Sequence, residues 1–107
     1  MINIAVDQCV GLKKIAQLES LGYKVVARAD NSEPDESWIH RALDCGALFV
    51  IGADRDIPVI IEQEMYPMVW IDWPNYDKEA RPHLVSYVDK RIKFKLDFFH
   101  GLTKVAL

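Results

Sequence analysis

The stretch FVIGADRD, residues 49–56, decides how this chain is expected to fold. Its first half is a continuous apolar run, which is typical of a strand buried at the centre of a parallel sheet. The run stops at Asp54 and Asp56, two carboxylates separated by one residue. A second apolar run, residues 2–6, also ends in a carboxylate, Asp7. If the two runs are neighbouring parallel strands, the three carboxylates meet at one edge of the sheet.

The N-terminal part of the chain predicts a strand, a helix and a second strand. Residues 2–6 are the first strand, and apolar residues at helical spacing predict a helix over 12–21. Gly22 suits the position just after a helix end, and residues 23–27 read as the second strand. The connections are short, which indicates parallel strands joined by a right-handed crossover.

The middle of the chain continues this alternation. Pro34 followed by two acidic residues favours a helix start, and Cys45 with Gly46 is expected to end that helix. Residues 47–51 are the predicted third strand, within the opening stretch. A short helix is then expected over 57–65, and a fourth strand over 68–71. In the short helix three residues are expected to pack inward: Ile60, Ile61 and Met65.

The last segment carries two competing patterns. Five apolar positions follow helical spacing: Val85, Val88, Ile92, Leu96 and Phe99. Residues 91–98, however, alternate between polar and apolar as a strand would. We favour the helix, because its pattern is longer and because Pro82 suits a first turn and Gly101 a helix end. The whole chain, residues 1–107, is then expected to be a single α/β domain, a three-layer α/β/α sandwich around about four mostly parallel strands.

Composition limits the class of protein. Half of the 107 residues are apolar and only 5 are glycine and 5 proline, which indicates a globular domain. No apolar run approaches the roughly 20 residues that span a bilayer, and no basic segment precedes an apolar stretch at the start. We therefore expect a cytoplasmic protein without a membrane partner. Cys9 and Cys45 lack metal-site spacing and are expected to be buried thiols.

Charge is distributed unevenly along the chain. Residues 1–75 hold 6 basic and 12 acidic residues, a balance of −6, whereas residues 76–107 hold 7 basic and 4 acidic residues, a balance of +3. Four basic side chains fall close together: Lys90, Arg91, Lys93 and Lys95. Such a cluster can follow a nucleic-acid backbone, although a solvated helix face is the commoner explanation.

Carboxylates at several strand ends and at one helix start predict a metal site. Asp35 and Glu36 begin the second helix, and the loop that leads to it leaves from the same edge as Asp7, Asp54 and Asp56. Oxygen ligands without histidine or cysteine favour a hard cation, Mg²⁺ or Mn²⁺. A cation of this kind lowers the pKa of a bound water and neutralises phosphoryl oxygens, as phosphodiester hydrolysis requires.

In order and spacing, these motifs resemble the PIN-like family, especially its short members related to toxin-type ribonucleases. The matching pieces are LGYKV at 21–25, DESW at 35–38 with a small residue at Ala42, and GADRDI at 52–57. The resemblance covers residues 1 to about 72. It implies a Rossmann-like parallel sheet with flanking helices, and Mg²⁺- or Mn²⁺-dependent cleavage of RNA. It also implies a protein partner of the antitoxin or regulatory kind.

The resemblance assigns roles to particular residues. Asp7 corresponds to the first family acid, Asp54 to the third and Asp56 to the fourth. Either Asp35 or Glu36 corresponds to the helix acid. Together these residues are expected to hold the metal and to carry the catalysis, while the basic residues from Lys90 to Lys95 position the RNA.

Several neighbours of these acids depart from the family pattern. Gly52 replaces a serine or threonine, Ile57 replaces a phenylalanine, and Gln8 with Cys9 replaces a polar pair. Loss of supporting groups commonly weakens metal binding or activity. A catalytically degenerate member that acts as a protein-binding module is therefore the alternative, and a homodimer is open in either case.

Aromatic residues bear on the same alternative. Trp38 and Trp70 are expected in the core, whereas Trp73, beside a proline, is expected at the surface. An aromatic surface over residues 70–76 could then stack RNA bases or bind a protein. A flavodoxin-like small-ligand binder is disfavoured, because the sequence has no glycine-rich or Ser/Thr-rich phosphate loop.

Overall fold

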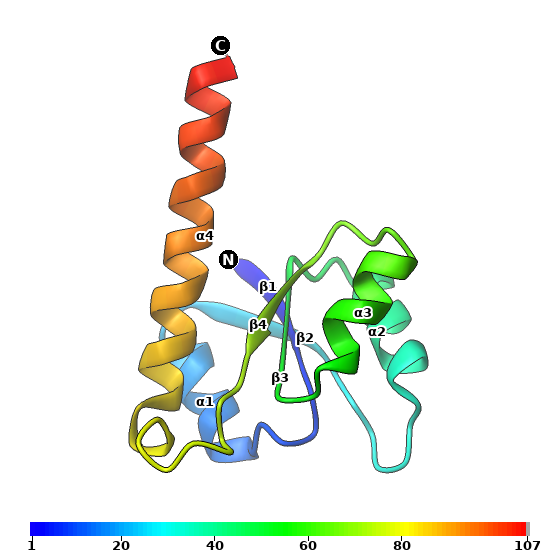
Figure 1. Cartoon of the computed structure of the whole chain (residues 1–107). Coiled ribbons are helices and arrows are strands. Elements are labelled where there is room, and N and C mark those ends of the chain that lie inside the picture. Colours follow the sequence, from blue (N-terminus) through cyan, green and yellow to red (C-terminus); the bar gives the residue numbers. More distant parts are fainter. Residues whose placement is uncertain (107) are drawn as a thin grey trace.

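The chain alternates strands and helices throughout. The computed structural model describes the backbone of residues 1–106 and the side chains of residues 1–98. The elements are β1 (Ile2–Val6), α1 (Leu12–Ser20), β2 (Tyr23–Arg28), α2 (Asp35–Asp44), β3 (Phe49–Gly52), α3 (Asp56–Gln63), β4 (Val69–Asp72), the 3-10 helix η1 (Arg81–His83) and α4 (Leu84–Ala106), as Figure 1 shows. Within residues 1–106, no helix has the length and apolar character that crossing a bilayer would require.

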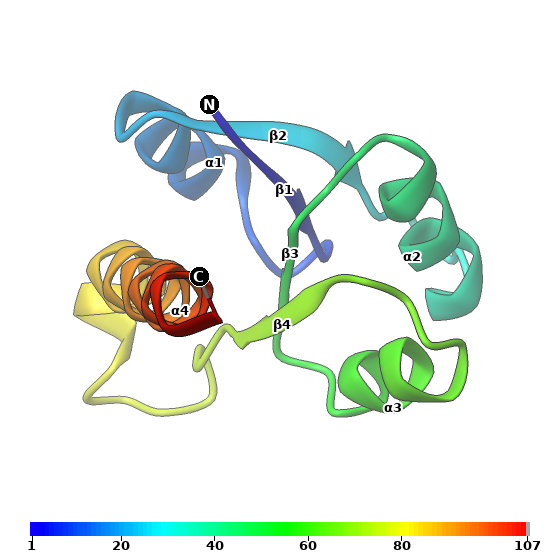
Figure 2. The ribbon, with the colours of Figure 1, turned by 90° about the horizontal axis from the view of Figure 1, so that it is seen from above.

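The four strands form one parallel sheet in the order β2-β1-β3-β4. The crossover through α1 leads outward from β1 to β2, and the crossover through α2 returns past β1 to β3. Right-handed crossovers in opposite directions place their helices on opposite faces of a sheet. Figure 2 shows this arrangement, with α1 and α4 on one face and α2 and α3 on the other. The predicted three-layer α/β/α sandwich is confirmed.

Each face of the sheet has its own apolar core. On the α1 and α4 face, Ile4 and Ile51 pack with Leu18 of α1 and with Val88 and Ile92 of α4. On the other face, small residues such as Ala5 and Ala27 lie beneath α2 and α3, where the larger side chains come from the helices. Because both faces are covered, β1 and β3 need apolar residues on both sides, which explains their continuous apolar runs.

The last segment is a helix, as the longer of its two patterns predicts. Val88 and Ile92 are fully buried against the sheet, and Leu96 is partly buried. The side chain of Phe99 lies outside the described side chains. Gly101 does not end the helix, because α4 continues to Ala106. An internal glycine costs a helix only about 1 kcal/mol relative to alanine, so it need not be an end signal.

Trp73 is buried, contrary to the sequence prediction. Only 1% of it is exposed, and it packs in the same core as Leu84 and Val88. The turn after β4 looks like a surface loop in the sequence, but α4 covers it. The predicted aromatic surface over residues 70–76 is therefore largely absent, although Tyr76 remains exposed. Trp38 is fully buried, as predicted, and Trp70 is partly buried.

Two predictions of burial are wrong for a shared reason. Cys9 and Cys45 are exposed, since Cys9 lies in the loop after β1 and Cys45 caps the end of α2. Met65 is also exposed, because it adopts a positive φ of 55° just after α3 and turns the chain away. In each case the residue lies at a turn, where neither the usual burial preference of cysteine nor the helical spacing of apolar positions determines which way a side chain faces.

A polar contact fastens α4 to the start of β2. The Tyr23 hydroxyl donates a hydrogen bond of 2.5 Å to Asp89, and Lys93 donates one of 3.0 Å to the same carboxylate. Partial burial by itself would raise the pKa of Asp89, but these two donors outweigh it and lower the pKa below its ordinary value. The charged carboxylate is therefore the form that the folded protein stabilises.

We expect Asp89→Asn to lower the free energy of unfolding at pH 7 by about 1 kcal/mol, since it removes the charge that both donors share. A lowered pKa stabilises the fold above the ordinary carboxyl value and ceases to do so as the pH falls through the folded value. The difference from wild type should therefore shrink below about pH 4. Urea unfolding at several pH values measures it, with Asp97→Asn on the same helix as the control. Equal stability of Asp89→Asn and wild type at pH 7 would contradict this role of the contact.

Candidate metal centre

Acidic side chains gather where the parallel strands end. Asp7 follows β1, and Asp54 follows β3, while Asp35 and Asp56 are the first residues of α2 and α3. The strand order reverses between β1 and β3, so the loops that leave these strands diverge. In open α/β sheets, ligands bind at this point, outside the carboxyl ends of the strands.

Three of these carboxylates come close to one another. Asp35, Asp54 and Asp56 each offer a ligand oxygen, and these atoms lie within 4.8 Å of one another. Asp35 is partly buried, whereas Asp54 and Asp56 are exposed. This acidic triad draws Asp35 from α2, Asp54 from the loop after β3 and Asp56 from α3, and its oxygens could hold a hard cation such as Mg²⁺ or Mn²⁺.

Hydrogen bonds orient two members of the triad. The indole Nε1 of the buried Trp38 donates to Oδ1 of Asp35 over 2.9 Å. The backbone N–H of Asp56 donates to Oδ1 of Asp54, also over 2.9 Å. The second contact closes a tight turn directly before α3. Both carboxylates thus keep one oxygen engaged with the protein, and each has a second oxygen that can face a ligand.

Within the triad, Asp35 is the member whose charged form is disfavoured. The pKa of Asp35 is raised above its ordinary value, first by burial and then by the neighbouring Asp54, both through a shared hydrogen bond and through its charge. The charge of Asp7 acts in the same direction, and only the Trp38 indole opposes the shift. Carboxylates held together in this way repel one another unless a proton or a cation lies between them.

Asp7 lies beside the triad and packs against β3. Its backbone N–H donates to the carbonyl of Ile51 over 2.8 Å, and its Oδ1 accepts from the N–H of Gln8 over 2.7 Å. A Cβ atom built on Gly52 would lie 2.8 Å from Cβ and 3.2 Å from Oδ2 of Asp7. The same atom would lie 2.6 Å from a methyl carbon of Ile57.

These contacts change the interpretation of Gly52. In the sequence it looks like a lost serine or threonine that would weaken the site. In the structure its missing side chain is the space that Asp7 and Ile57 occupy. Gly52 is therefore a packing requirement of this chain's own arrangement.

The structure distinguishes between Asp35 and Glu36 as the acid that α2 contributes, a choice that the sequence left open. Asp35 belongs to the acidic triad, whereas Glu36 is exposed and is not a member of it. Successive residues of a helix point about 100° apart, so only one of the two can face β3. Asp35 is held in that direction by Trp38, one turn further along α2.

Sequence reasoning missed two residues at this edge. Asp72 ends β4, pairs with Gly52 in the sheet and accepts a hydrogen bond of 2.5 Å from the Tyr76 hydroxyl. The sequence pattern that identified Asp7, an apolar strand ending in aspartate, could also have identified Asp72. The second residue is Cys9. The thiol of Cys9 lies near Asp7 and Asp72. Although the residue as a whole is exposed, partial desolvation of its sulfur raises the pKa of the thiol, and a hydrogen bond to the Ala53 backbone opposes this.

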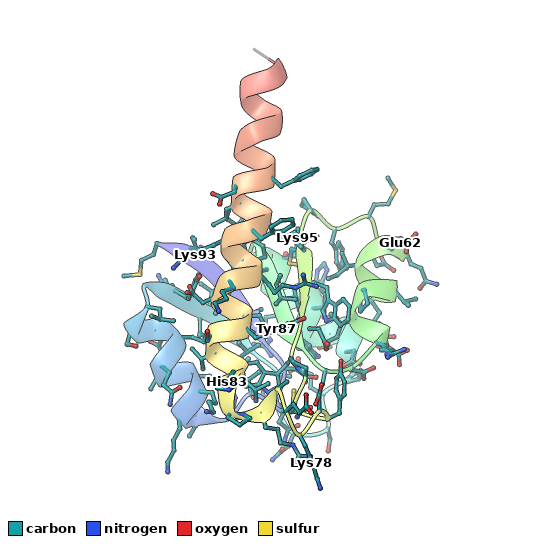
Figure 3. The ribbon with its side chains drawn as sticks, turned by 60° about the vertical axis from the view of Figure 1, so that its left-hand side comes forward. Glu62, Lys78, His83, Tyr87, Lys93 and Lys95 are labelled. Atoms are coloured by element: carbon teal, nitrogen blue, oxygen red, sulfur yellow. The ribbon has the colours of Figure 1, made fainter. Side chains whose placement is uncertain are left out.

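The four basic residues predicted to bind RNA lie around α4. Lys93 pairs with Asp89, and the Arg91 guanidinium lies 5.5 Å from the centre of the Tyr87 ring. Lys90 lines a shallow groove with His83, Ser86 and Tyr87. Figure 3 shows Lys93 and Lys95 on opposite sides of the helix. The residues that line this groove belong to η1 and the first turns of α4. In Figure 1, the start of α4 lies at the end of the molecule where the strands end.

No family model, no curated protein and no solved structure matches this chain. The resemblance to the PIN-like family therefore remains a hypothesis that depends on the quoted motifs.

We expect Gly52→Ala to destabilise the protein by about 1–3 kcal/mol, because the added methyl group overlaps Asp7 and Ile57 in a packed region. Thermal or urea unfolding measures the loss. Gly11→Ala is the control, since nothing lies within 4 Å of a Cβ atom at that position. If Gly52→Ala were no more destabilising than Gly11→Ala, the close packing of Asp7 on β3 would be wrong.

We expect Asp35→Asn to raise the melting temperature at pH 7 by a few degrees when divalent metal is absent. Asparagine keeps an oxygen for Trp38 but removes one of the repelling charges. A raised carboxyl pKa means that the folded state binds the proton more tightly, so wild-type stability falls as the pH rises through that folded pKa. The gain in the variant should therefore diminish toward acidic pH. Glu36→Gln, outside the triad, should show no such gain; an equal gain would contradict the repulsion within the triad.

Proposed function

We propose that this protein is a divalent-metal-dependent, PIN-like ribonuclease that hydrolyses RNA phosphodiesters. The observation that carries the proposal is the acidic triad, with ligand oxygens within 4.8 Å of one another at the switch point of a parallel sheet. The proposal also uses the sequence resemblance, whose acids coincide with the triad at Asp35, Asp54 and Asp56.

The residues present fit a hard cation. All three triad members are carboxylates, and the pKa of Asp35 is raised first by burial and then by the neighbouring carboxylates, whose negative charge a cation would neutralise. Asp35, Asp54 and Asp56 would hold Mg²⁺ or Mn²⁺, and Asp7 would add negative charge from β1. When bound, such a cation supplies an activated water and neutralises charge on a phosphoryl oxygen.

The protein's own contribution is to hold these groups in place. Trp38 orients Asp35, the Asp56 amide orients Asp54, and Gly52 allows Asp7 to approach β3. Each support comes from an element that is packed on the sheet, and a rigid scaffold of this kind suits a metal site. On this proposal, the lost hydroxyl at position 52 does not by itself imply a degenerate site.

The alternative is a protein-binding module that keeps the fold without the chemistry. One observation favours it. At the opposite edge of the sheet, beside α4, lies an apolar cavity of 330 Å³ lined by Leu48, Phe49, Tyr66, Pro67, Met68, Val69 and Leu96. Phe94, on the exposed side of α4, is 64% exposed. Apolar concave surfaces of this kind can receive a partner's side chains.

Metal binding and RNA cleavage separate the two proposals. We expect Mn²⁺ to raise the melting temperature of the wild type in a concentration-dependent way, because a ligand that binds only the folded state stabilises it. Asp54→Asn should lose this shift, although asparagine can still accept the hydrogen bond from Asp56. Glu36→Gln should keep it.

The matching activity assay uses single-stranded RNA with and without Mn²⁺. Cleavage should require the metal and fall by at least about 100-fold in Asp54→Asn, because losing a metal ligand should cost no less than the 10–100-fold typical of losing an outer-shell partner. A wild type with no metal-dependent shift and no cleavage would reject the nuclease and leave the binding module as the working proposal.

A further inference from the structure

A second polar feature lies at the same edge of the sheet as the candidate metal centre. A pocket of 220 Å³ at the carboxyl ends of β1 and β2 is lined by Gln8, Arg28, Ala29, Asp30 and Asn31. Gln8 directly follows Asp7, and its backbone N–H donates to the Asp7 carboxylate. The pocket and the acids are thus connected through adjacent residues.

An irregularity in β2 determines which way Arg28 faces. The pairing of β1 with β2 runs from Ile4–Val25 to Ala5–Ala27, so Val26 is an extra residue on the β2 side. Beyond it, Arg28 pairs with Val6, whose side chain packs on the α1 face of the sheet. Without the extra residue, strict alternation would place Arg28 on the opposite face. Bulges often redirect a side chain beside a functional site.

Arg28 has an unsatisfied donor. Its Nε atom is shielded from solvent and has no hydrogen-bond partner among the described residues. None of the described ion pairs involves Arg28 either. A shielded donor on a permanently charged group is costly, and it needs a specific reason to persist.

Arg41 of α2, which contacts the backbone of Arg28, provides a contrast. Its guanidinium bonds to Glu33 over 2.6 Å and to the backbone carbonyl of Arg28 over 2.9 Å. It is a satisfied structural arginine. Arg28, by comparison, lines the polar pocket, and its shielded Nε has no hydrogen-bond partner among the described residues.

We propose that the pocket around Arg28 binds a phosphate of the RNA backbone, next to the phosphodiester at the acidic triad. This inference rests on the proposed nuclease function, whose substrate it positions. Guanidinium is planar and always charged, and its paired N–H groups match two oxygens of a phosphate. Without such a cation, an acidic centre would repel the polyanion that it is meant to cleave.

The other residues that line the pocket indicate which kind of phosphate it suits. The Gln8 side-chain amide donates to the Asn31 side-chain oxygen, so the Asn31 amide nitrogen could donate to a ligand. The Asp30 carboxylate also lines the pocket and adds a negative charge. The pocket therefore suits the single charge of a phosphodiester better than the double charge of a terminal phosphate.

The test uses the full chain without metal, with dimethyl phosphate as the probe. In ¹⁵N–¹H spectra, the Nε–H resonance of Arg28, assigned by its loss in Arg28→Gln, should shift and saturate as dimethyl phosphate is added. Inorganic phosphate should produce a weaker shift. Absence of any shift at that resonance would overturn the proposal.

Substitutions in the pocket test whether it contributes to RNA binding and cleavage. Arg28→Gln should weaken the binding of a short single-stranded RNA in EDTA about 10-fold and raise KM for its cleavage in Mn²⁺, with kcat changed less. Arg28→Lys, which keeps the charge but not the planar donor pair, should be intermediate. Lys24→Gln, the same charge change at the other end of β2, should have less than a twofold effect. Asn31→Ala, at an exposed position, provides a second pocket variant that leaves the strand intact.

The outcomes distinguish the two proposals. If dimethyl phosphate binds at Arg28 but the wild type cleaves no RNA, the phosphodiester pocket stands and the nuclease is rejected. If the wild type cleaves RNA while Arg28→Gln and Asn31→Ala retain its KM and RNA affinity, the nuclease stands and the pocket proposal is overturned.

Discussion

The parallel pairing of β1 with β3 is the constraint on which the rest of the site depends. It brings the end of β1 against the end of β3 so closely that Asp7 occupies the space beside Gly52. The chain then leaves β1 in one direction and β3 in the other, which opens the switch point of the sheet. The short loops that follow deliver Asp54 and Asp56, and the α2 crossover brings Asp35 to the same edge.

The charges at this edge oppose the stability of the fold. Three carboxylates lie close together, and the pKa of Asp35 is raised by burial and by Asp54. Arg28, whose Nε is shielded from solvent and has no partner among the described residues, lies on β2, the strand beside β1. Clustered negative charges and a positive group without a full set of partners thus lie at one end of an otherwise well-packed domain. Such unfavourable charge arrangements are expected where a protein binds a charged ligand.

Sequence reasoning was most reliable where the signal is local. The apolar runs that end in Asp7 and Asp54 predicted parallel strands with acids at one edge, and the structure has that arrangement. The helical spacing of Val88 and Ile92 predicted α4. It failed at turns and under distant elements: Cys9, Met65 and Trp73 each face a direction that depends on a chain reversal or on the packing of α4.

The sequence by itself therefore determined the order of strands and helices, the α/β class and the acidic strand ends, because these follow from periodicity and from neighbouring residues. The tertiary structure decided which acid of the Asp35–Glu36 pair joins the triad, since that depends on the rotation of α2 against β3. It also decided that the missing side chain of Gly52 leaves room for Asp7 and that a bulge in β2 pairs Arg28 with Val6. These features arise from strand register and from contacts between segments far apart in the chain, which no local pattern records.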